Sequence, residues 1–188
     1  ATTDPVVMGT VGAGAGATVG KSGGQGRRPM KGGLGSASIT MPNGLVVGAI
    51  VAVNSVGDII DPYTGKVVAG SLNPDDTFAD ARILMRTGAR LRRERPGQNT
   101  TIGLVATNAK LTKAEVTKVA QMADDGYARA IYPAHTLGDG DTIFALATGR
   151  FEGEANASMI SALAAEAMAD ALLAAVREAT SAGGVTAV

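Results

Sequence analysis

The stretch Asn99-Thr100-Thr101-Ile102-Gly103-Leu104-Val105-Ala106-Thr107-Asn108 joins a polar turn directly to an apolar run. Its β-branched content from Thr101 to Thr107 predicts a strand. Thr100 stands at the junction, where a rigid strand fixes a hydroxyl just behind a turn that cleavage could remove. This placement suits a nucleophile exposed by chain cleavage. It also suits an ordinary pair of β-forming threonines, and the stretch alone leaves both interpretations open.

Cleavage before Thr100 would create a catalytic base on the same residue. An N-terminal α-amino group has a pKa of about 7.7–8.0, much closer to neutrality than that of a lysine amine. A freed Thr100 amine could therefore activate the Thr100 hydroxyl for acyl transfer.

The composition predicts one globular domain with a core of small side chains. The chain has 188 residues, 45% of them hydrophobic but only 3% aromatic. Lys+Arg and Asp+Glu number 17 each. A neutral chain with few aromatics lacks the cationic field and stacking surface of a nucleic-acid binder. The interrupted basic cluster Arg90, Arg92, Arg93 and Arg95 is interpreted as a solvated surface.

The absence of cysteine excludes disulfides, thiolate metal sites and Cys nucleophiles. With a single histidine, His135, and acids not spaced as ligands, we expect neither a metal nor another cofactor. No segment approaches the about 18 consecutive apolar residues of a membrane span, and no signal-peptide pattern is present. We therefore expect a cytoplasmic protein without membrane contact. The first residue, Ala1, indicates a processing or boundary position.

The order of predicted elements favours a layered α/β sandwich. The glycine-dense first third predicts tight loops around a site. A capping box, Thr112 to Glu115, begins the long helix in the middle of the chain. The predicted strands are 36–40, 45–53 (buried), 101–107 and 142–148, with turns at 42–44 and 61–65; the predicted helices are 78–86 (short), 113–130 and 157–180.

The segment Ala15–Ser22 satisfies a relaxed phosphate-loop pattern, and Gly12-Ala13-Gly14 is similar to part of a dinucleotide fingerprint. Both motifs require a strand before the loop and a helix after it. Here three further glycines and Pro29 follow, and they do not propagate a helix. We therefore reject nucleotide binding as the principal function.

Several blocks, in order, resemble the DmpA-like family of self-cleaving aminopeptidases and amidases. These blocks are Gly12–Lys21, Met30–Ser38, Val51–Asp58, Asn99–Ile102, Thr107-Asn108 and Asp139–Ala145. The resemblance implies a four-layer αββα sandwich of the N-terminal-nucleophile type. It also implies cleavage between Asn99 and Thr100, which would leave residues 1–99 and 100–188 as two subunits of one domain. Several such pairs would assemble together. Family chains carry a further segment before the glycine-rich block.

The resemblance also assigns site residues. Thr100 matches the nucleophile, while Lys21 and Asn54 match further active-site positions. Asn54, at a strand end, would donate its amide to the oxyanion, and Lys21 would orient the nucleophile or lower its pKa. An ordinary strand-ending Asn and a surface lysine are the alternatives. Asp139 and Asp141 match the paired acids of the nylon-oligomer hydrolases and would hold the Thr100 ammonium or hydroxyl; an acidic turn is the alternative.

We interpret His135 as structural, because a Ser-His-Asp triad finds no further support in the sequence. The expected function is amide or peptide hydrolysis through an acyl-enzyme on Thr100. An acyltransferase on a related scaffold, a nucleotide-binding module and a non-catalytic homologue are alternatives. Peptides, β-peptides, pantetheine-like amides and 6-aminohexanoate oligomers all stay open as substrates.

Overall fold

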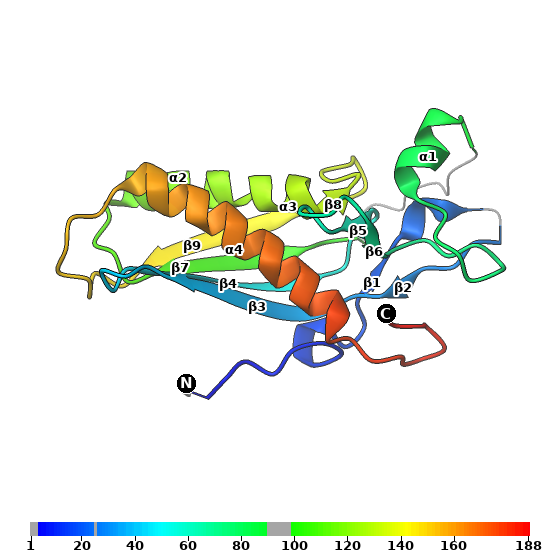
Figure 1. The fold of residues 1–188 in the computed structure, drawn as a ribbon, viewed down its shortest axis with the longest axis horizontal. Coiled ribbons are helices and arrows are strands. Elements are labelled where there is room, and N and C mark those ends of the chain that lie inside the picture. The colour runs from blue at the N-terminus through cyan, green and yellow to red at the C-terminus, as the bar shows by residue number, and fades with distance from the viewer. Residues whose placement is uncertain (1–3, 25, 90–98) are drawn as a thin grey trace.

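A four-stranded mixed sheet forms the centre of the computed structural model, which describes residues 4–24, 26–89 and 99–188. The strand order is β3-β4-β7-β9 (Figure 1). β3 pairs antiparallel with β4, β4 antiparallel with β7, and β7 parallel with β9. The strands are β3 (Gly33–Thr40), β4 (Val46–Val53), β7 (Ile102–Thr107) and β9 (Thr142–Ala147).

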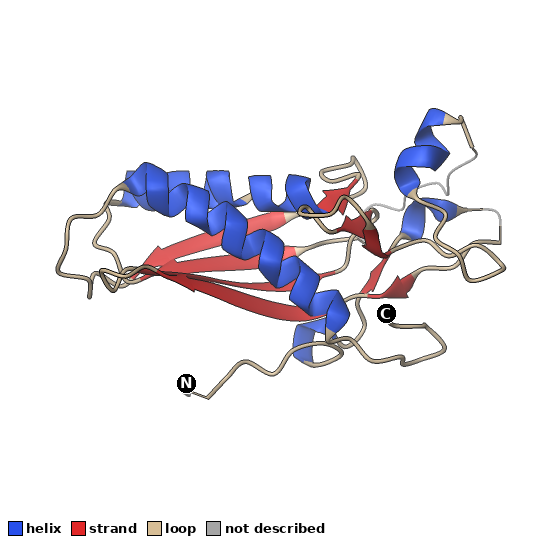
Figure 2. Cartoon of the chain, viewed as in Figure 1, coloured by secondary structure: helices blue, strands red, loops and turns tan. Residues whose placement is uncertain are grey.

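Helices cover one face of this sheet (Figure 2). α4 (Ala157–Arg177) crosses β3 and β4, while α2 (Lys113–Ala123) lies beside it and contacts β9; α3 (Asp125–Ala130) follows α2. The backbone approaches closely at this interface, since a Cβ on Gly35 of β3 would lie 2.0 Å from the Ala171 carbonyl oxygen of α4. Small residues therefore set the spacing between helix and sheet, as the composition predicts.

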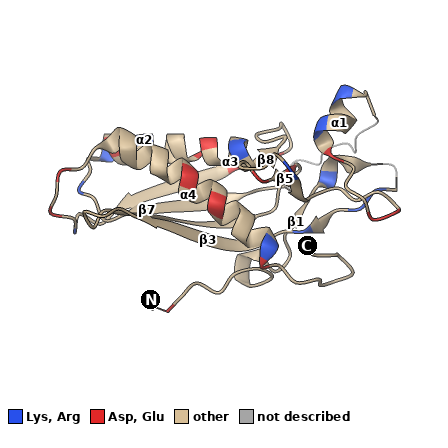
Figure 3. Ribbon diagram, in the orientation of Figure 1, with Lys and Arg blue, Asp and Glu red and all other residues tan. Residues whose placement is uncertain are grey.

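α4 is long and apolar enough to cross a membrane by length and composition, although the sequence analysis found no such run. Two acidic residues, Glu166 and Asp170, interrupt the apolar sequence of this helix. Glu166 is exposed and Asp170 is half-buried, and Figure 3 shows the acidic positions of α4 in red. In the most apolar stretch of this helix, 67% of the residues are buried inside the protein. The apolar face of α4 thus packs against the sheet and α2.

Smaller elements surround the end of the sheet where β4 finishes and β7 begins. A three-stranded sheet has the order β6-β5-β8, and β1 pairs with β2. The bounds are η1 (Gly12–Gly14), β1 (Thr18–Val19), η2 (Lys21–Gly23), β2 (Met30–Lys31), β5 (Asp58–Ile60), β6 (Val67–Ala69), α1 (Ala81–Arg86) and β8 (Ile131–Tyr132). β1 lies in the middle of the phosphate-loop pattern. The pattern is followed only by the three-residue η2 and not by the helix that a phosphate loop requires. The structural argument against a phosphate loop is therefore confirmed.

The predicted elements are found, with corrected bounds for three helices and for one strand, since β3 begins at Gly33 instead of Ser36. The helix predicted over 113–130 is divided at Asp124 into α2 and α3. In α3, Gly126 packs closely against α4, since a Cβ there would be 2.6 Å from the Ala165 carbonyl oxygen. The last helix ends at Arg177 rather than Thr180. The short helix begins only at Ala81, where Asp80 caps it. The basic cluster at 90–95 lies outside the described residues.

β4 also departs from prediction, because only alternate residues are buried. Its other face belongs to the side of the sheet opposite the helices. Among the described residues, large apolar side chains are exposed on this face of the sheet, including Ile102, Phe144 and Leu146. The α/β class is confirmed. The described residues form one helical layer on one main sheet, and the four-layer arrangement remains what the resemblance implies.

Candidate active site

The site forms where the end of β4 meets the start of β7. β4 and β7 are antiparallel, and Ala52 is opposite Ile102. Asn54, just after β4, and Thr100, just before β7, are therefore neighbours across the sheet. The Thr100 backbone N–H donates to the Asn54 carbonyl oxygen at 3.0 Å. Strand register alone thus brings together two residues 46 positions apart in the sequence.

The carbonyl group before Thr100 accepts two hydrogen bonds. The Asn99 oxygen accepts the Gly140 N–H at 2.8 Å and the Thr100 hydroxyl at 2.7 Å. A donated hydrogen bond draws electron density from a carbonyl carbon and stabilises an oxyanion on that oxygen. The peptide bond between Asn99 and Thr100 is therefore polarised by the main chain, with the candidate nucleophile in contact with it.

Lys21 is tied to Asn54. Its Nζ donates to Asn54 Oδ1 at 2.6 Å and lies 3.2 Å from the Asn54 carbonyl oxygen. Asn54 Oδ1 also accepts the Thr18 N–H at 3.2 Å, so the carbonyl end of the side chain is held by two donors. Lys21 and the Thr100 N–H thus meet at one carbonyl oxygen. The structure places Lys21, Asn54 and Thr100 together, as the sequence predicts.

Burial lowers the pKa of Lys21 to about 8, despite the opposing attraction of Asp139 and Asp141. An amine taken out of water loses stabilisation of its charged form. A substantial fraction of Lys21 is consequently neutral near pH 8, where a neutral amine can accept a proton.

The two acids of the Asp139-Gly140-Asp141 turn hold the main chain of the site. Asp139 accepts the N–H of Val56 at 3.3 Å and both the N–H and the hydroxyl of Thr136. Asp141 Oδ1 accepts the Thr101 N–H at 2.9 Å. These bonds go to neighbours of Thr100 and Asn54 instead of to the Thr100 hydroxyl or N–H.

The pKa of Asp141 is raised, chiefly by burial and further by Asp139; the Thr101 N–H and His135 oppose that rise. Its Oδ2 is buried and has no hydrogen-bond partner among the described residues. One oxygen of Asp141 is thus fixed to the chain behind the nucleophile, and the other is buried without a comparable bond.

A cavity of about 210 Å³ opens beside Thr100. Its walls are small or apolar, apart from Asn54 and Thr100 themselves. The lining residues are Ala13, Gly16, Ala17, Ala52, Asn54, Thr100 and Ile102. The glycine-rich loop therefore borders the site, as the sequence predicts, and leaves room for a substrate next to the hydroxyl.

Sequence reasoning missed the role of Gly140. The sequence shows a glycine between two acids. It does not show that the backbone N–H of this glycine is a donor, because every residue except proline has such an N–H. A Cβ at this position would lie 2.7 Å from Thr100 Oγ1, so only glycine leaves the hydroxyl in place. The same reasoning missed that His135 reaches the site, with Nδ1 at 3.6 Å from Asp141 Oδ2.

Comparison with known proteins shows what the chain is similar to. The model of peptidase family S58 matches residues 1–188. An uncharacterized aminopeptidase of Mycobacterium leprae is 42% identical over 96% of this chain and 51% of its own length. A 6-aminohexanoate-oligomer endohydrolase of Paenarthrobacter ureafaciens is 32% identical over 66% of this chain and 39% of its own length. The chain spans about half the length, or less, of these relatives.

The fold is similar to that of a solved L-aminopeptidase D-Ala-esterase/amidase from Ochrobactrum anthropi, described as a variant of the Ntn hydrolase fold. The TM-score is 0.66 at 19% identity, covering 100% of this chain and 51% of the other. This likeness shows an Ntn-type fold and confirms the predicted fold class.

Proposed function

The chain belongs to peptidase family S58, and we propose that it cleaves itself between Asn99 and Thr100 and then hydrolyses amide or peptide bonds with Thr100 as nucleophile. One observation carries the proposal: Thr100 Oγ1 and the Gly140 N–H lie 2.7 and 2.8 Å from the same carbonyl oxygen of Asn99. A hydroxyl next to the carbonyl group that it would attack, with an oxyanion donor already on that carbonyl oxygen, supports an N→O acyl shift, for which the hydroxyl turns its proton away from the Asn99 oxygen.

In the self-cleavage step, Lys21 takes up the proton of the Thr100 hydroxyl. The Thr100 oxygen attacks the Asn99 carbonyl carbon, and the Gly140 N–H stabilises the resulting oxyanion. The C–N bond then breaks as protonated Lys21 returns its proton to the leaving nitrogen, which becomes the neutral α-amine of Thr100, and an ester joins Asn99 to Thr100 Oγ1. Water hydrolyses the ester and releases the Asn99 carboxylate and the Thr100 hydroxyl.

In the hydrolytic step, a substrate carbonyl occupies the position that Asn99 held. The free Thr100 amine, next to the Asn54 carbonyl oxygen, accepts the proton of its own hydroxyl. Attack forms an acyl ester on Thr100 and releases the substrate amine; water then releases the acid. Asn54 contributes its side-chain amide, and Gly140 its N–H, to the oxyanion.

The substrates of the relatives indicate the bond class. The matched proteins are named as an aminopeptidase and as an endohydrolase of 6-aminohexanoate oligomers. Both names describe cleavage of linear amides. The small and apolar walls of the cavity support an uncharged acyl group next to Thr100.

An intact mass spectrum under denaturing conditions tests the proposal. We expect two fragments that meet at Asn99 and Thr100, and a single uncut mass for Thr100→Ala. Thr100→Ser keeps the hydroxyl and is expected to be cut. A wild-type chain that stays whole, or a Thr100→Ala chain that is cut at the same bond, would overturn the proposal.

A further inference from the structure

The only histidine in the sequence lies between two carboxylates at the back of the site. His135 Nδ1 is 3.6 Å from Asp141 Oδ2, and His135 Nε2 is 3.6 Å from Asp124 Oδ2. Both distances are within ion-pair range but longer than a good hydrogen bond. The imidazole thus connects the end of α2 to the turn that carries the paired acids.

The Asp141 oxygen that faces His135 is otherwise unsatisfied. Oδ2 is buried without a hydrogen bond among the described residues, and the Asp141 side chain is only 4% exposed. A buried carboxylate oxygen without a partner is costly, and a nearby cation or N–H donor is the usual compensation. His135 is the group placed to supply it.

The Thr101 peptide is held by the groups that surround His135. Asp141 Oδ1 accepts the Thr101 N–H at 2.9 Å, and the Tyr127 hydroxyl donates to the Thr101 carbonyl oxygen at 3.3 Å. The rings of Tyr127 and His135 stack, with centroids 6.3 Å apart. Thr101 follows Thr100 directly, so a change at His135 reaches the nucleophile through one peptide.

The backbone of His135 is in an unfavourable conformation, with φ at +54°. Residues other than glycine seldom adopt this left-handed region. Such conformations persist where the surrounding contacts require them. Here the conformation accompanies an imidazole in ion-pair range of two carboxylates.

We propose that His135, with Asp124 behind it, is a positioning residue that keeps the Asp141 carboxylate ionised and fixed on the Thr101 N–H. This inference rests on the proposed function of Thr100. The titratable groups that face Asp141 are His135, Asp139 on the same turn, Lys21 across the site and Tyr127 from α3. His135 and Lys21 are the groups among them that face Asp141 with nitrogen atoms, and Lys21 is held by Asn54.

The sign of the pH effect follows from these charges. Burial and Asp139 raise the pKa of Asp141, whereas the Thr101 N–H, the imidazole of His135 and the His135 backbone N–H lower it. Removing the imidazole therefore raises the pKa of Asp141 further, and the carboxylate stays protonated to a higher pH. The acidic limb that Asp141 sets, which is separate from the limb that Lys21 sets near pH 8, is then expected to move to higher pH, with the rate restored well above it.

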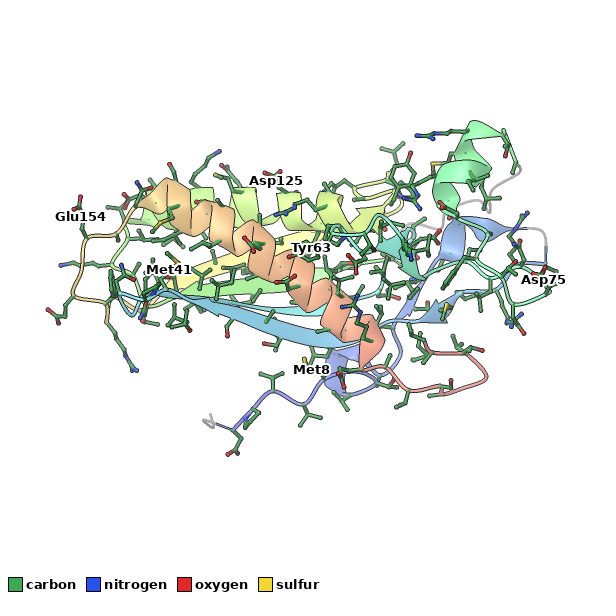
Figure 4. All side chains as sticks on the ribbon, viewed as in Figure 1. Met8, Met41, Tyr63, Asp75, Asp125 and Glu154 are labelled. Carbon is green, nitrogen blue, oxygen red and sulfur yellow. The ribbon has the colours of Figure 1, made fainter. Side chains whose placement is uncertain are left out.

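The test uses His135→Asn in the full chain. Asn tolerates the left-handed backbone, and its amide nitrogen takes the place of Nδ1 without the charge. We expect a folded chain with a cooperative melting transition, a self-cleavage rate about tenfold lower on the acidic limb, and near-normal cleavage at high pH. Asp124→Asn is expected to shift the limb in the same direction, but less. Asp125→Asn, on the exposed neighbouring position, is the matched control (Figure 4).

The outcomes separate the two proposals. If the wild-type chain does not cut itself, the proposed function is overturned, independently of the result for the His135 variant. A wild-type chain that cuts itself, with a His135→Asn profile that superimposes on it, overturns the role of His135. A rate lowered equally at every pH would also overturn it, because a purely structural defect does not move a limb.

Discussion

The backbone N–H of Gly140 donates a hydrogen bond of 2.8 Å to the carbonyl oxygen of Asn99. The parallel pairing of β7 and β9 begins with Ile102 opposite Thr142. An isolated bridge between Asn99 and Asp139 extends the same register toward the N-terminal ends of the strands, and this bond lies there. Sheet register therefore places the donor on the carbonyl group. The proposed electrophile needs no separate binding loop, because the sheet itself aligns it.

Gly140→Ala is expected to slow or abolish self-cleavage. The new Cβ would lie 2.7 Å from Thr100 Oγ1, so the hydroxyl or the turn must move. Displacing an oxyanion donor typically costs about 10²–10³ in rate. The measurement is the uncut fraction against time by intact mass. Gly48→Ala, whose Cβ would meet its neighbours at an ordinary 3.7 Å, is the control and should cut normally. Normal cleavage of Gly140→Ala would remove this glycine from the mechanism.

Lys21→Met is expected to remove a rising limb from the pH profile of self-cleavage. Burial lowers the pKa of Lys21 to about 8, so the neutral amine is about a tenth of the total at pH 7 and about half at pH 8. If this amine is the base, the wild-type rate rises with pH and levels off above about 8. Rates of both chains from pH 6 to 10 decide the point. An identical limb in Lys21→Met would assign it to another group.

The sequence predicts the main elements because their signals are local. The capping box at Thr112 and Glu115 is present, and Asn156 caps α4 by accepting the Met159 N–H. The short strands β5, β6 and β8 were not predicted. Their residues pair through β5 with partners distant in the sequence, such as Asp58 with Tyr132. Pairing of that kind leaves no periodic pattern in so few residues.

The site was predictable to the extent that side chains define it. Lys21, Asn54 and Thr100 were assigned through the resemblance to the DmpA-like family, and they lie together. The direct contacts of the acids were not predictable, since Asp139 and Asp141 bind main-chain N–H groups whose positions depend on register. His135 was interpreted as structural because the spacing gives no sign of its approach to Asp141.

Gly35→Ala is expected to destabilise the fold without changing the site. A Cβ on Gly35 would lie 2.0 Å from the Ala171 carbonyl oxygen and 2.5 Å from the Ala175 nitrogen, so α4 must move away from β3. Forced overpacking of this kind costs about 1–3 kcal/mol and sometimes more. Urea unfolding measures the loss, with Gly48→Ala as the control within the same sheet. Equal stability of the two variants would contradict the close packing of α4 on β3.

Asn54→Asp is expected to move the rising limb of the self-cleavage profile to higher pH. The side-chain oxygen of Asn54 lies 2.6 Å from Lys21 Nζ, and a carboxylate there would stabilise the ammonium and raise the pKa of Lys21. Asn54→Ala removes the same amide without adding charge and is the matched comparison. Both variants should lose rate, because each loses the side-chain amide assigned to the oxyanion. Only the Asp variant should need a more alkaline solution to reach its plateau. A limb that stays near pH 8 in Asn54→Asp would separate Lys21 from the base, whereas a shifted limb that disappears in the double variant with Lys21→Met would assign the proton transfer to this pair.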